Sequence, residues 1–282
     1  MTRTTTSIPL NRGGAEERRT RRKQNRGLLE DVLCGLRSSA SPRWILAAAY
    51  ILLALSAHGQ TAAKTPATPL KEGFPFTDES LHYSMNWQSG LSLGDAAMTA
   101  QHTTTGWNFE VTLNAGVPGF AIADKFTSNT DTGICSAELD RELSHAGRRT
   151  SEKTTFDQKN GTARRVTLFP QSGGSSTYDI ASCARDALAF AYYARVELGQ
   201  GRVPAPQQIF LGSPYTVRMD YGGAQNVTTG EKTVMTDRLT VSVKGPRSDF
   251  SFEIFFARDA ARTPLRMLIP TSLGTFTLEL VR

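Results

Sequence analysis

Few residues in this sequence have the type and spacing that acid–base or metal chemistry requires. His82, His102 and His145 lie far apart and lack metal-ligand spacing, so each is interpreted as a solvated strand or loop residue. We find no phosphate-binding loop and no His-Glu-x-x-His motif, and Gly173-Gly174 lies in a Ser/Gly-rich stretch typical of a loop. We therefore expect no catalytic residues, no cofactor, no metal site, and a protein that is not an enzyme.

The most patterned polar group is Asp259-x-x-Arg262-Thr263-Pro264. One interpretation is a site that binds a charged ligand. The other is structural: Asp259 holds a tight turn by accepting hydrogen bonds from backbone amides, Arg262 pairs with it, and Pro264 begins the next strand. We favour the structural interpretation and treat these residues as a candidate turn motif.

Two cysteines, Cys135 and Cys183, are predicted to form a structural disulfide. They are the only cysteines after Cys34, which lies near the N-terminus. In an oxidising compartment an isolated pair in one domain favours a bridge, here tying a loop between strands to the start of a helix. The alternative is two buried thiols, since free cysteine is often buried. No Cys-x-x-Cys pair indicates a redox-active role.

These residues belong to a region whose apolar side chains recur at every second position. Such alternation is typical of an antiparallel sheet with one apolar and one wet face. It is clear in residues 81–88, 107–114, 238–244, 250–256 and 276–280, and weaker in 96–102, 125–130, 215–221, 232–236 and 265–269. Asn160-Gly161 predicts a hairpin with a two-residue turn between strands 154–157 and 163–169.

One segment, residues 183–198, has helical spacing instead. Ser182 is its candidate N-cap and Gly199 its candidate stop, and Phe190 and Tyr193 make the side opposite its alanines apolar as well. A helix buried on more than one face fits inside a curved sheet. We therefore predict a mainly β (α+β) fold of about ten to twelve strands: a curved antiparallel sheet or half-open barrel with one main helix packed against it.

The inward face of this sheet is rich in aromatic residues, and two outcomes remain open. Helix and aromatics fill the concavity and give a dry core, or the sheet curves enough to leave an apolar pocket. The residues concerned are Tyr83, Met85, Trp87, Trp107, Phe109, Phe250, Phe252, Phe256 and Phe276.

The N-terminal part differs sharply in charge from the rest. Residues 1–43 hold ten basic and four acidic residues, which accounts for the whole net charge of +6. The basic balance therefore gives no evidence of a nucleic-acid-binding face. An apolar segment at 44–57, uninterrupted from 44 to 55, follows these charges and suits a signal peptide, the alternative being an inner-membrane anchor. We expect an exported protein of the periplasm or cell envelope, with membrane contact only through this leader.

The chain accordingly divides into a leader, a tether and one domain. Residues 1–59 form the leader, and residues 60–73, rich in Thr, Ala, Pro and Lys, form a linker whose composition cannot bury a core. Residues 74–282 are long enough for a single β-rich domain with a sizeable core.

Several short stretches of this domain, in order and spacing, resemble the bacterial domain-of-unknown-function family 3108. They are residues 81–87 followed by Gly94, residues 185–188 with 192–195, residues 259–264, and residues 274–280. The resemblance implies an exported envelope protein with a β-rich fold, and no functional residues, since the family has no established activity. Periplasmic lipoprotein carriers, which hold acyl chains in a half-open barrel, are a more distant analogy. The long basic leader departs from the short leader that the family would imply.

Two functions remain as expectations. The first is a noncatalytic binding or carrier protein for an apolar or glycolipid-like ligand. The second is a structural or assembly factor that binds a protein partner in the envelope. An apolar cavity between sheet and helix would favour the first, and a packed core with an exposed apolar patch would favour the second.

Overall fold

The computed structural model describes residues 77–281 except 118–119, 247 and 272–273. The predicted leader, apolar segment 44–57 and linker lie outside the described residues. Within the described part, no helix is long and apolar enough to span a membrane.

Fifteen strands in the described residues form a single sheet. The first eight are β1 (Glu79–Trp87), β2 (Ser92–His102), β3 (Gly106–Val117), β4 (Phe120–Asp131), β5 (Ser136–His145), β6 (Arg148–Asp157), β7 (Thr162–Phe169) and β8 (Ser175–Asp179), with a 3-10 turn at Gln171–Gly173. The other seven are β9 (Arg185–Asp186), β10 (Gln207–Phe210), β11 (Pro214–Thr229), β12 (Lys232–Lys244), β13 (Asp249–Ala257), β14 (Pro264–Thr271) and β15 (Gly274–Val281). Helix α2 (Ala187–Gly199) connects β9 to β10.

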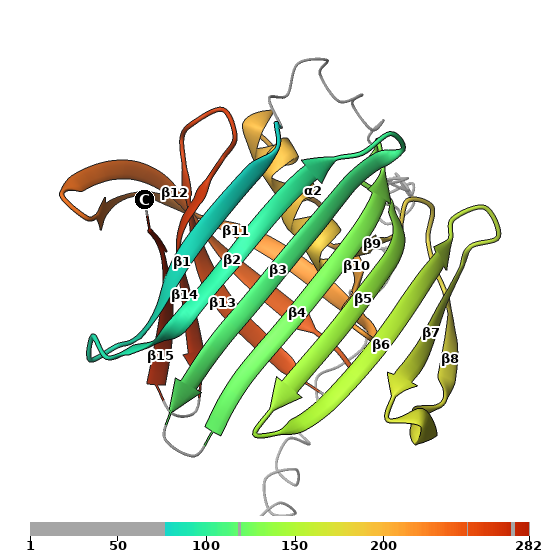
Figure 1. Cartoon of the computed structure of the whole chain (residues 1–282). Coiled ribbons are helices and arrows are strands. Elements are labelled where there is room, and N and C mark those ends of the chain that lie inside the picture. The colour runs from blue at the N-terminus through green and yellow to red at the C-terminus, as the bar shows by residue number, and fades with distance from the viewer. Residues whose placement is uncertain (1–76, 118–119, 247, 272–273, 282) are drawn as a thin grey trace, which may run out of the picture. The chain divides into compact units, whose positions relative to one another are not determined.

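The sheet consists of two antiparallel meanders joined through β1 and β15. Each strand from β1 to β8 pairs with the next, each strand from β10 to β15 does likewise, and β1 pairs with β15 in a register that sets Trp87 opposite Phe276. The two edges are β8 and the short β9, which pairs with β10 in parallel. The sheet curls so that β2–β5 face β11–β13 across a concave interior (Figure 1).

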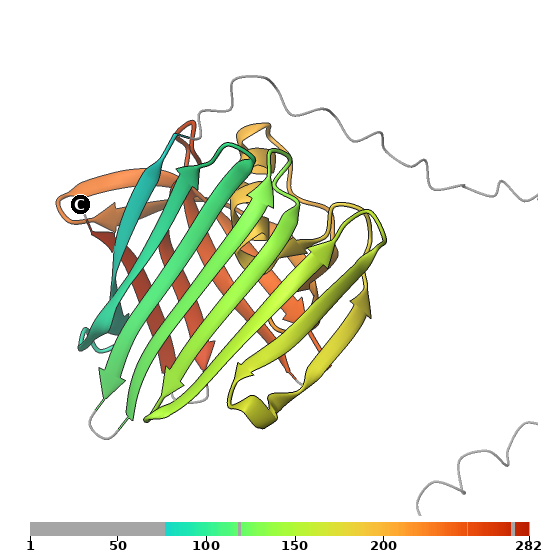
Figure 2. The ribbon, with the colours of Figure 1, turned by 45° about the vertical axis from the view of Figure 1, so that its right-hand side comes forward.

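Helix α2 lies inside this interior, between the two halves of the sheet, as Figure 2 shows from a second direction. On one side Tyr192 stacks on Phe109 of β3 with ring centroids 4.0 Å apart. On the other side Phe190 packs in a cluster with Val217 of β11 and Leu239 of β12. The helix is therefore buried on two faces, because both halves of the sheet present their apolar side chains to it.

The edge formed by β9 and β10 packs against β5–β7, which closes the barrel partially without strand pairing. The backbone N–H of Ser136 donates to the carbonyl of Ala184 at 3.0 Å. Phe156 and Phe210 form an edge-to-face pair with centroids 5.3 Å apart. The sheet is thus curved and not closed, and the predicted mainly β fold with one packed helix is confirmed.

Three local predictions need correction. The helix begins at Ala187 and not at 183, because Arg185 and Asp186 pair with β10 first, and Asp186 rather than Ser182 is the N-cap. The hairpin between β6 and β7 exists, but its loop has four residues, 158–161, since Asp157 pairs with Thr162. The sheet has fifteen strands in the described residues, more than the ten to twelve expected.

Candidate ligand-binding site

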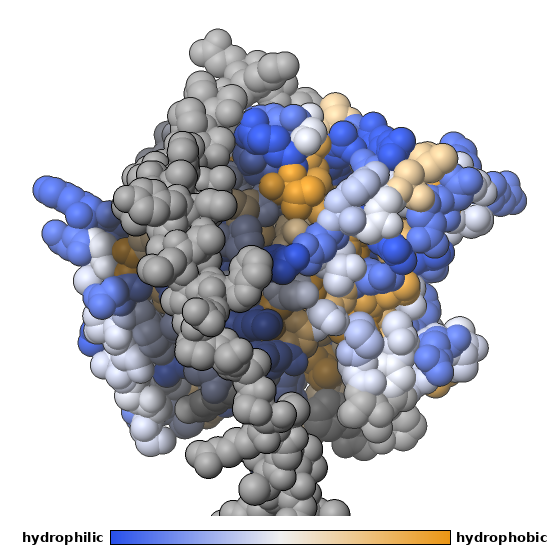
Figure 3. All heavy atoms as spheres, turned by 180° about the vertical axis from the view of Figure 1, so that it is seen from behind, coloured by the Kyte–Doolittle hydropathy of each residue, from blue (hydrophilic) through white to orange (hydrophobic). Residues whose placement is uncertain are grey.

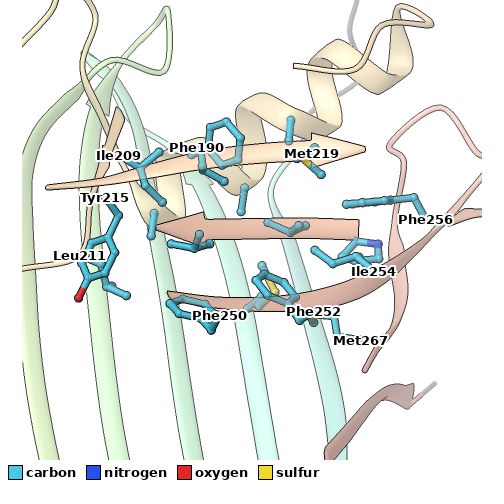
Figure 4. Close-up of a pocket in the computed structure, with 18 residues that line it drawn as sticks. Phe190, Ile209, Leu211, Tyr215, Met219, Phe250, Phe252, Ile254, Phe256 and Met267 are labelled. Carbon is cyan, nitrogen blue, oxygen red and sulfur yellow. The ribbon is translucent and has the colours of Figure 1, made fainter. Parts of the chain in front are cut away.

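An apolar cavity lies between helix α2 and strands β10–β13, and it is called the α2 chamber here. Its volume is about 230 Å³. Figure 4 shows its eighteen lining residues, which come from the helix, from the inward faces of β10–β13, from the β10–β11 turn, and from β2 and β14. They are Met98, Ala187, Phe190, Ala191, Ala194, Ile209, Leu211, Tyr215, Val217, Met219, Val241, Val243, Phe250, Phe252, Ile254, Phe256, Pro264 and Met267.

The chamber exists because the helix turns small residues towards a wide apolar sheet. Ala187, Ala191 and Ala194 are spaced by four and three residues, so they share one face of α2. Opposite them, alternate side chains of β12 and β13 point inward, among them Val241 and Phe252. Because an alanine reaches only as far as its methyl group, the sheet and the helix leave space that larger residues would fill.

A second apolar cavity, the β15 chamber, lies farther along the concave face. Its volume is about 370 Å³. Its lining residues all come from strands β1–β4, β14 and β15: Met85, Trp87, Leu93, Leu113, Ala115, Gly116, Ile122, Ile269, Phe276 and Leu278. None of these residues has a polar side chain apart from the indole N–H of Trp87.

The lining of the α2 chamber is suited to binding hydrocarbon. Its eighteen residues include no acid, base, thiol or amide side chain, and the hydroxyl of Tyr215 is its single side-chain oxygen. Figure 3 shows the molecule from behind, with orange apolar residues gathered in a recess that blue hydrophilic residues surround. An apolar cavity that side chains leave unfilled is typical of a ligand-binding site, because in a packed core the same apolar surface would be removed from water.

Charged side chains lie beyond the β10–β11 turn, next to Tyr215. Arg141 of β5 pairs with Glu152 of β6 at 2.8 Å, and Arg165 of β7 donates to the carbonyl of Gly212 at 2.9 Å. Burial lowers the pKa of Arg141, and the charges of Glu152 and then Tyr215 oppose that change. A side chain at position 212 would meet the Arg141 guanidinium, and φ there is +75°, so glycine is required for this approach.

The disulfide predicted between Cys135 and Cys183 is present, with Cα atoms 4.7 Å apart. Cys135 lies in the β4–β5 turn and Cys183 just before β9. The bond therefore ties the middle of one meander to the outer edge of the other, and it holds the strand that leads into α2.

The candidate turn motif has a geometry close to the structural interpretation, with one difference. Asp259 accepts hydrogen bonds from the backbone N–H of Thr263 at 2.9 Å and from its hydroxyl at 2.7 Å. Pro264 begins β14 and lines the α2 chamber. Arg262, however, pairs with Asp237 of β12 at 2.8 Å and not with Asp259, because the turn points its side chain across to β12.

The three histidines are not brought together. His82 lies 3.1 Å from the hydroxyl of Ser80, and the ring of His102 meets the edge of Trp107. His145 pairs with Asp124 at 2.9 Å. No group of three or more His, Cys, Asp or Glu residues in the described part of the chain is arranged to hold a metal ion.

One sequence string, Gly90-Leu91-Ser92-Leu93-Gly94, does match the Gly-x-Ser-x-Gly pattern of hydrolases. That pattern carries a nucleophile only on a sharp turn from a strand into a helix. Here it forms the hairpin between β1 and β2, and Ser92 is exposed at the start of β2. The structure thus gives this serine no catalytic setting.

Sequence reasoning found the aromatic part of the chamber and missed the residues at the β10–β11 turn. Phe250, Phe252 and Phe256, expected on the inward face, all line it. Leu211 and Tyr215 were not expected there, because they belong to a turn and a strand start whose position depends on the distant pairing of β9 with β10. The alternation of β11 was the available signal for Tyr215.

Comparison with known proteins agrees with this architecture. Residues 82–281 match the family model described as "Protein of unknown function (DUF3108)". A crystal structure of a β-barrel-like protein with a domain of unknown function, DUF1849, from Brucella abortus is similar with a TM-score of 0.55 and 9% identity, over 73% of this chain and 96% of that one. A candidate exported protein with a YmcC-like fold from Bacteroides fragilis aligns over 72% of this chain and 93% of its own, with a TM-score of 0.26 and 5% identity. No curated protein matches the sequence.

Proposed function

The chain belongs to the DUF3108 family, and from the geometry of its concave face we propose that it is an exported protein that binds an apolar ligand and does not catalyse a reaction on it. The observation that carries the proposal is the α2 chamber, whose lining is apolar apart from the Tyr215 hydroxyl. A chamber of this kind gains affinity by removing apolar ligand surface from water, at about 25 cal/mol per Å². It has no group that could activate a bond.

Export is supported by the disulfide and by the basic and apolar leader. Disulfides such as Cys135–Cys183 persist in oxidising compartments and are rare in the cytosol. We therefore propose the periplasm or cell envelope as the place where the ligand is met. There an apolar ligand with low solubility in water would need a protein that shields it.

The cavity favours a binding protein over an assembly factor. The large apolar residues that the described part exposes, such as Leu91, Phe169 and Met235, lie on different strands and hairpins. A protein-docking surface would require such residues to form one continuous patch. The apolar surface that lines the α2 chamber is the continuous hydrophobic feature of the described residues instead.

The proposal is tested by titrating a fluorescent fatty acid, whose emission rises in apolar surroundings, into the purified full-length chain. We expect saturable binding. Ala191→Phe, which places a ring in the α2 chamber, should weaken binding by at least about tenfold. Ala260→Phe, the same substitution at an exposed position of the β13–β14 turn, is the matched control and should bind as the wild type does.

Thermal unfolding of each variant shows whether the fold is kept. If Ala191→Phe fails to fold, Ala191→Leu adds less volume at the same place. Absence of saturable binding by the wild type, or equal binding by a folded Ala191→Phe variant, would contradict the proposal.

A further inference from the structure

We propose that the α2 chamber and the β15 chamber form one continuous site for a long unbranched hydrocarbon chain, whose polar end lies at Tyr215 and whose other end lies in the β15 chamber. The inference rests on the proposed function, since it specifies the ligand of the same site. It assigns a role to the β15 chamber, which the binding proposal alone leaves unused.

The two chambers share a wall on β14. Met267 lines the α2 chamber and Ile269 lines the β15 chamber. Residues two apart on a strand point to the same face and lie about 7 Å apart. A hydrocarbon that crosses the inner face of β14 at these two residues would therefore pass directly from one chamber to the other.

Strand register places a second contact between the chambers. Met267 is opposite Leu278 of β15, and Leu278 is opposite Met85 of β1. Met267 lines the α2 chamber, whereas Leu278 and Met85 line the β15 chamber. Paired residues on neighbouring strands have Cα atoms about 5 Å apart, so the chambers meet within one row of side chains.

The residues at this junction are apolar and adaptable. Met98 and Met267 pack against the same cluster as Leu278 and Ile269. Methionine is unbranched and flexible and adjusts to irregular spaces, so two methionines can rotate to widen a passage without moving a strand. No polar group of the lining would be stripped of a partner when a hydrocarbon passes.

Volume favours a ligand that occupies both chambers. At about 230 Å³ the α2 chamber alone is smaller than usual ligand pockets, which start at about 300 Å³. The β15 chamber adds about 370 Å³. Tyr215 on β11 and Ile269 on β14 are three strand spacings apart, about 14 Å at 4.8 Å per strand, which suits an extended hydrocarbon and not a compact ring system.

The direction in which the bound hydrocarbon lies follows from the positions of polar groups and solvent. Tyr215 provides the hydroxyl of the α2 chamber, and Phe250, which lies at the same end on β13, is 42% exposed, so this end opens to water. The β15 chamber has no side-chain oxygen in its lining. A polar end therefore finds water and a hydroxyl partner at Tyr215, and the methyl end finds hydrocarbon.

The test compares octanoate with palmitate, measured by calorimetry on the full-length chain. Ala115→Phe fills the β15 chamber and should lower palmitate affinity at least tenfold while octanoate binds as before. Ala191→Phe fills the α2 chamber and should weaken both. Ala137→Phe, at an exposed position of β5, is the matched strand control and should change neither. Leu113→Phe is the gentler variant if Ala115→Phe does not fold.

A second measurement is independent of any substitution. Palmitate carrying a diazirine at its methyl end should label peptides that line the β15 chamber, such as those containing Leu113 or Phe276. Labelling confined to α2 and β12, or a folded Ala115→Phe variant that binds palmitate normally, overturns the two-chamber site while leaving the α2 chamber intact. Failure of the wild type to bind either acid overturns both proposals at their common basis.

Discussion

Arg195 of helix α2 binds the carboxylate of Glu79, at the start of β1, through both terminal nitrogens, with Nη2 3.0 Å from Oε2. Its Nε donates to the carbonyl of Ala261 at 2.9 Å. The Arg195 side chain is 1% exposed and that of Glu79 17%. All three guanidinium nitrogens have a partner, as a buried charge requires. The pair fixes the helix to the first strand and to the turn before β14.

Arg195→Met should destabilise the protein by about 3–5 kcal/mol, because it leaves the Glu79 carboxylate without its partner. Urea unfolding gives the free energy. The double variant with Glu79→Met should recover part of this loss, since no charge is then left unpaired. Arg218→Met is the control: Arg218 is 64% exposed in its pair with Asp220, so the cost should stay below about 1 kcal/mol. Equal losses for both arginines would refute the argument.

Replacing both Cys135 and Cys183 by serine should lower stability by about 4 kcal/mol, because the unfolded chain loses a loop closed over 48 residues. Urea unfolding of the wild type with and without reductant provides the matched comparison. Peptide mapping without reductant should recover the linked pair. Free reaction of both thiols with an alkylating agent in the native protein would show that the bridge is absent.

Asp186→Ala should cost at least about 2 kcal/mol, because Asp186 is both a helix cap and a buried acceptor of four hydrogen bonds. Its Oδ1 accepts from the N–H of Leu188 at 2.8 Å and of Ala189 at 3.0 Å. Its Oδ2 accepts from the hydroxyls of Ser128 at 2.5 Å and Ser136 at 2.6 Å. Asp186→Asn keeps the cap oxygen and should lose less. An alanine variant as stable as the asparagine one would contradict this role.

The pH dependence of stability should also report Asp186. Burial raises its pKa, against the opposing effect of the hydrogen bonds from Ser128 and Ser136. The folded state then holds the proton more tightly than the unfolded state, whose pKa is about 3.9. The proton bound by Asp186 stabilises the folded state fully at pH values below the unfolded-state pKa. This stabilisation is lost as the pH rises through the folded-state pKa. The stability of the wild type relative to Asp186→Asn should therefore fall as pH rises from about 4, and a constant difference would exclude it.

Asp259→Ala should cost about 1 kcal/mol through its two lost hydrogen bonds to Thr263, without changing fatty-acid binding. Asp259 lies outside the lining of the α2 chamber, so the substitution should destabilise the turn and leave the chamber unchanged. Urea unfolding and the fluorescence titration measure the two effects separately. Loss of ligand binding by a stable variant would instead support the charged-ligand interpretation of this motif.

Strands with clean alternation could be predicted from the sequence, and those with inward charges could not. β1, β3, β12, β13 and β15 all show the expected period of two. β5 was missed because Arg141 points into the interior and is neutralised there by Glu152, a partner on β6 that no local pattern reveals. The helix start was misplaced for a similar reason, since β9 exists only through its pairing with β10.

The candidate site could likewise be predicted only in part from the sequence. Inward-facing aromatics could be listed from alternation alone, but the same list fits a filled core or a hollow one. The choice depends on which helix residues lie opposite them, and Ala191 and Phe252 line one cavity only after the sheet has curled. The cavity volume is the difference between the space that the curled sheet encloses and the volume of the side chains within it. It therefore depends on long-range geometry, which the spacing of residues in the sequence does not reveal.

The alanine face of α2 sets the size of the α2 chamber, and it plays no part in the strand pairing that holds the sheet together. Strand pairing depends on backbone hydrogen bonds, whereas the chamber's depth depends on side chains at 187, 191 and 194 of one helix. We expect conservative substitutions at these three positions to alter the space without changing the strand register. Under the proposed function, ligand size would therefore change through the helix while the sheet stays constant.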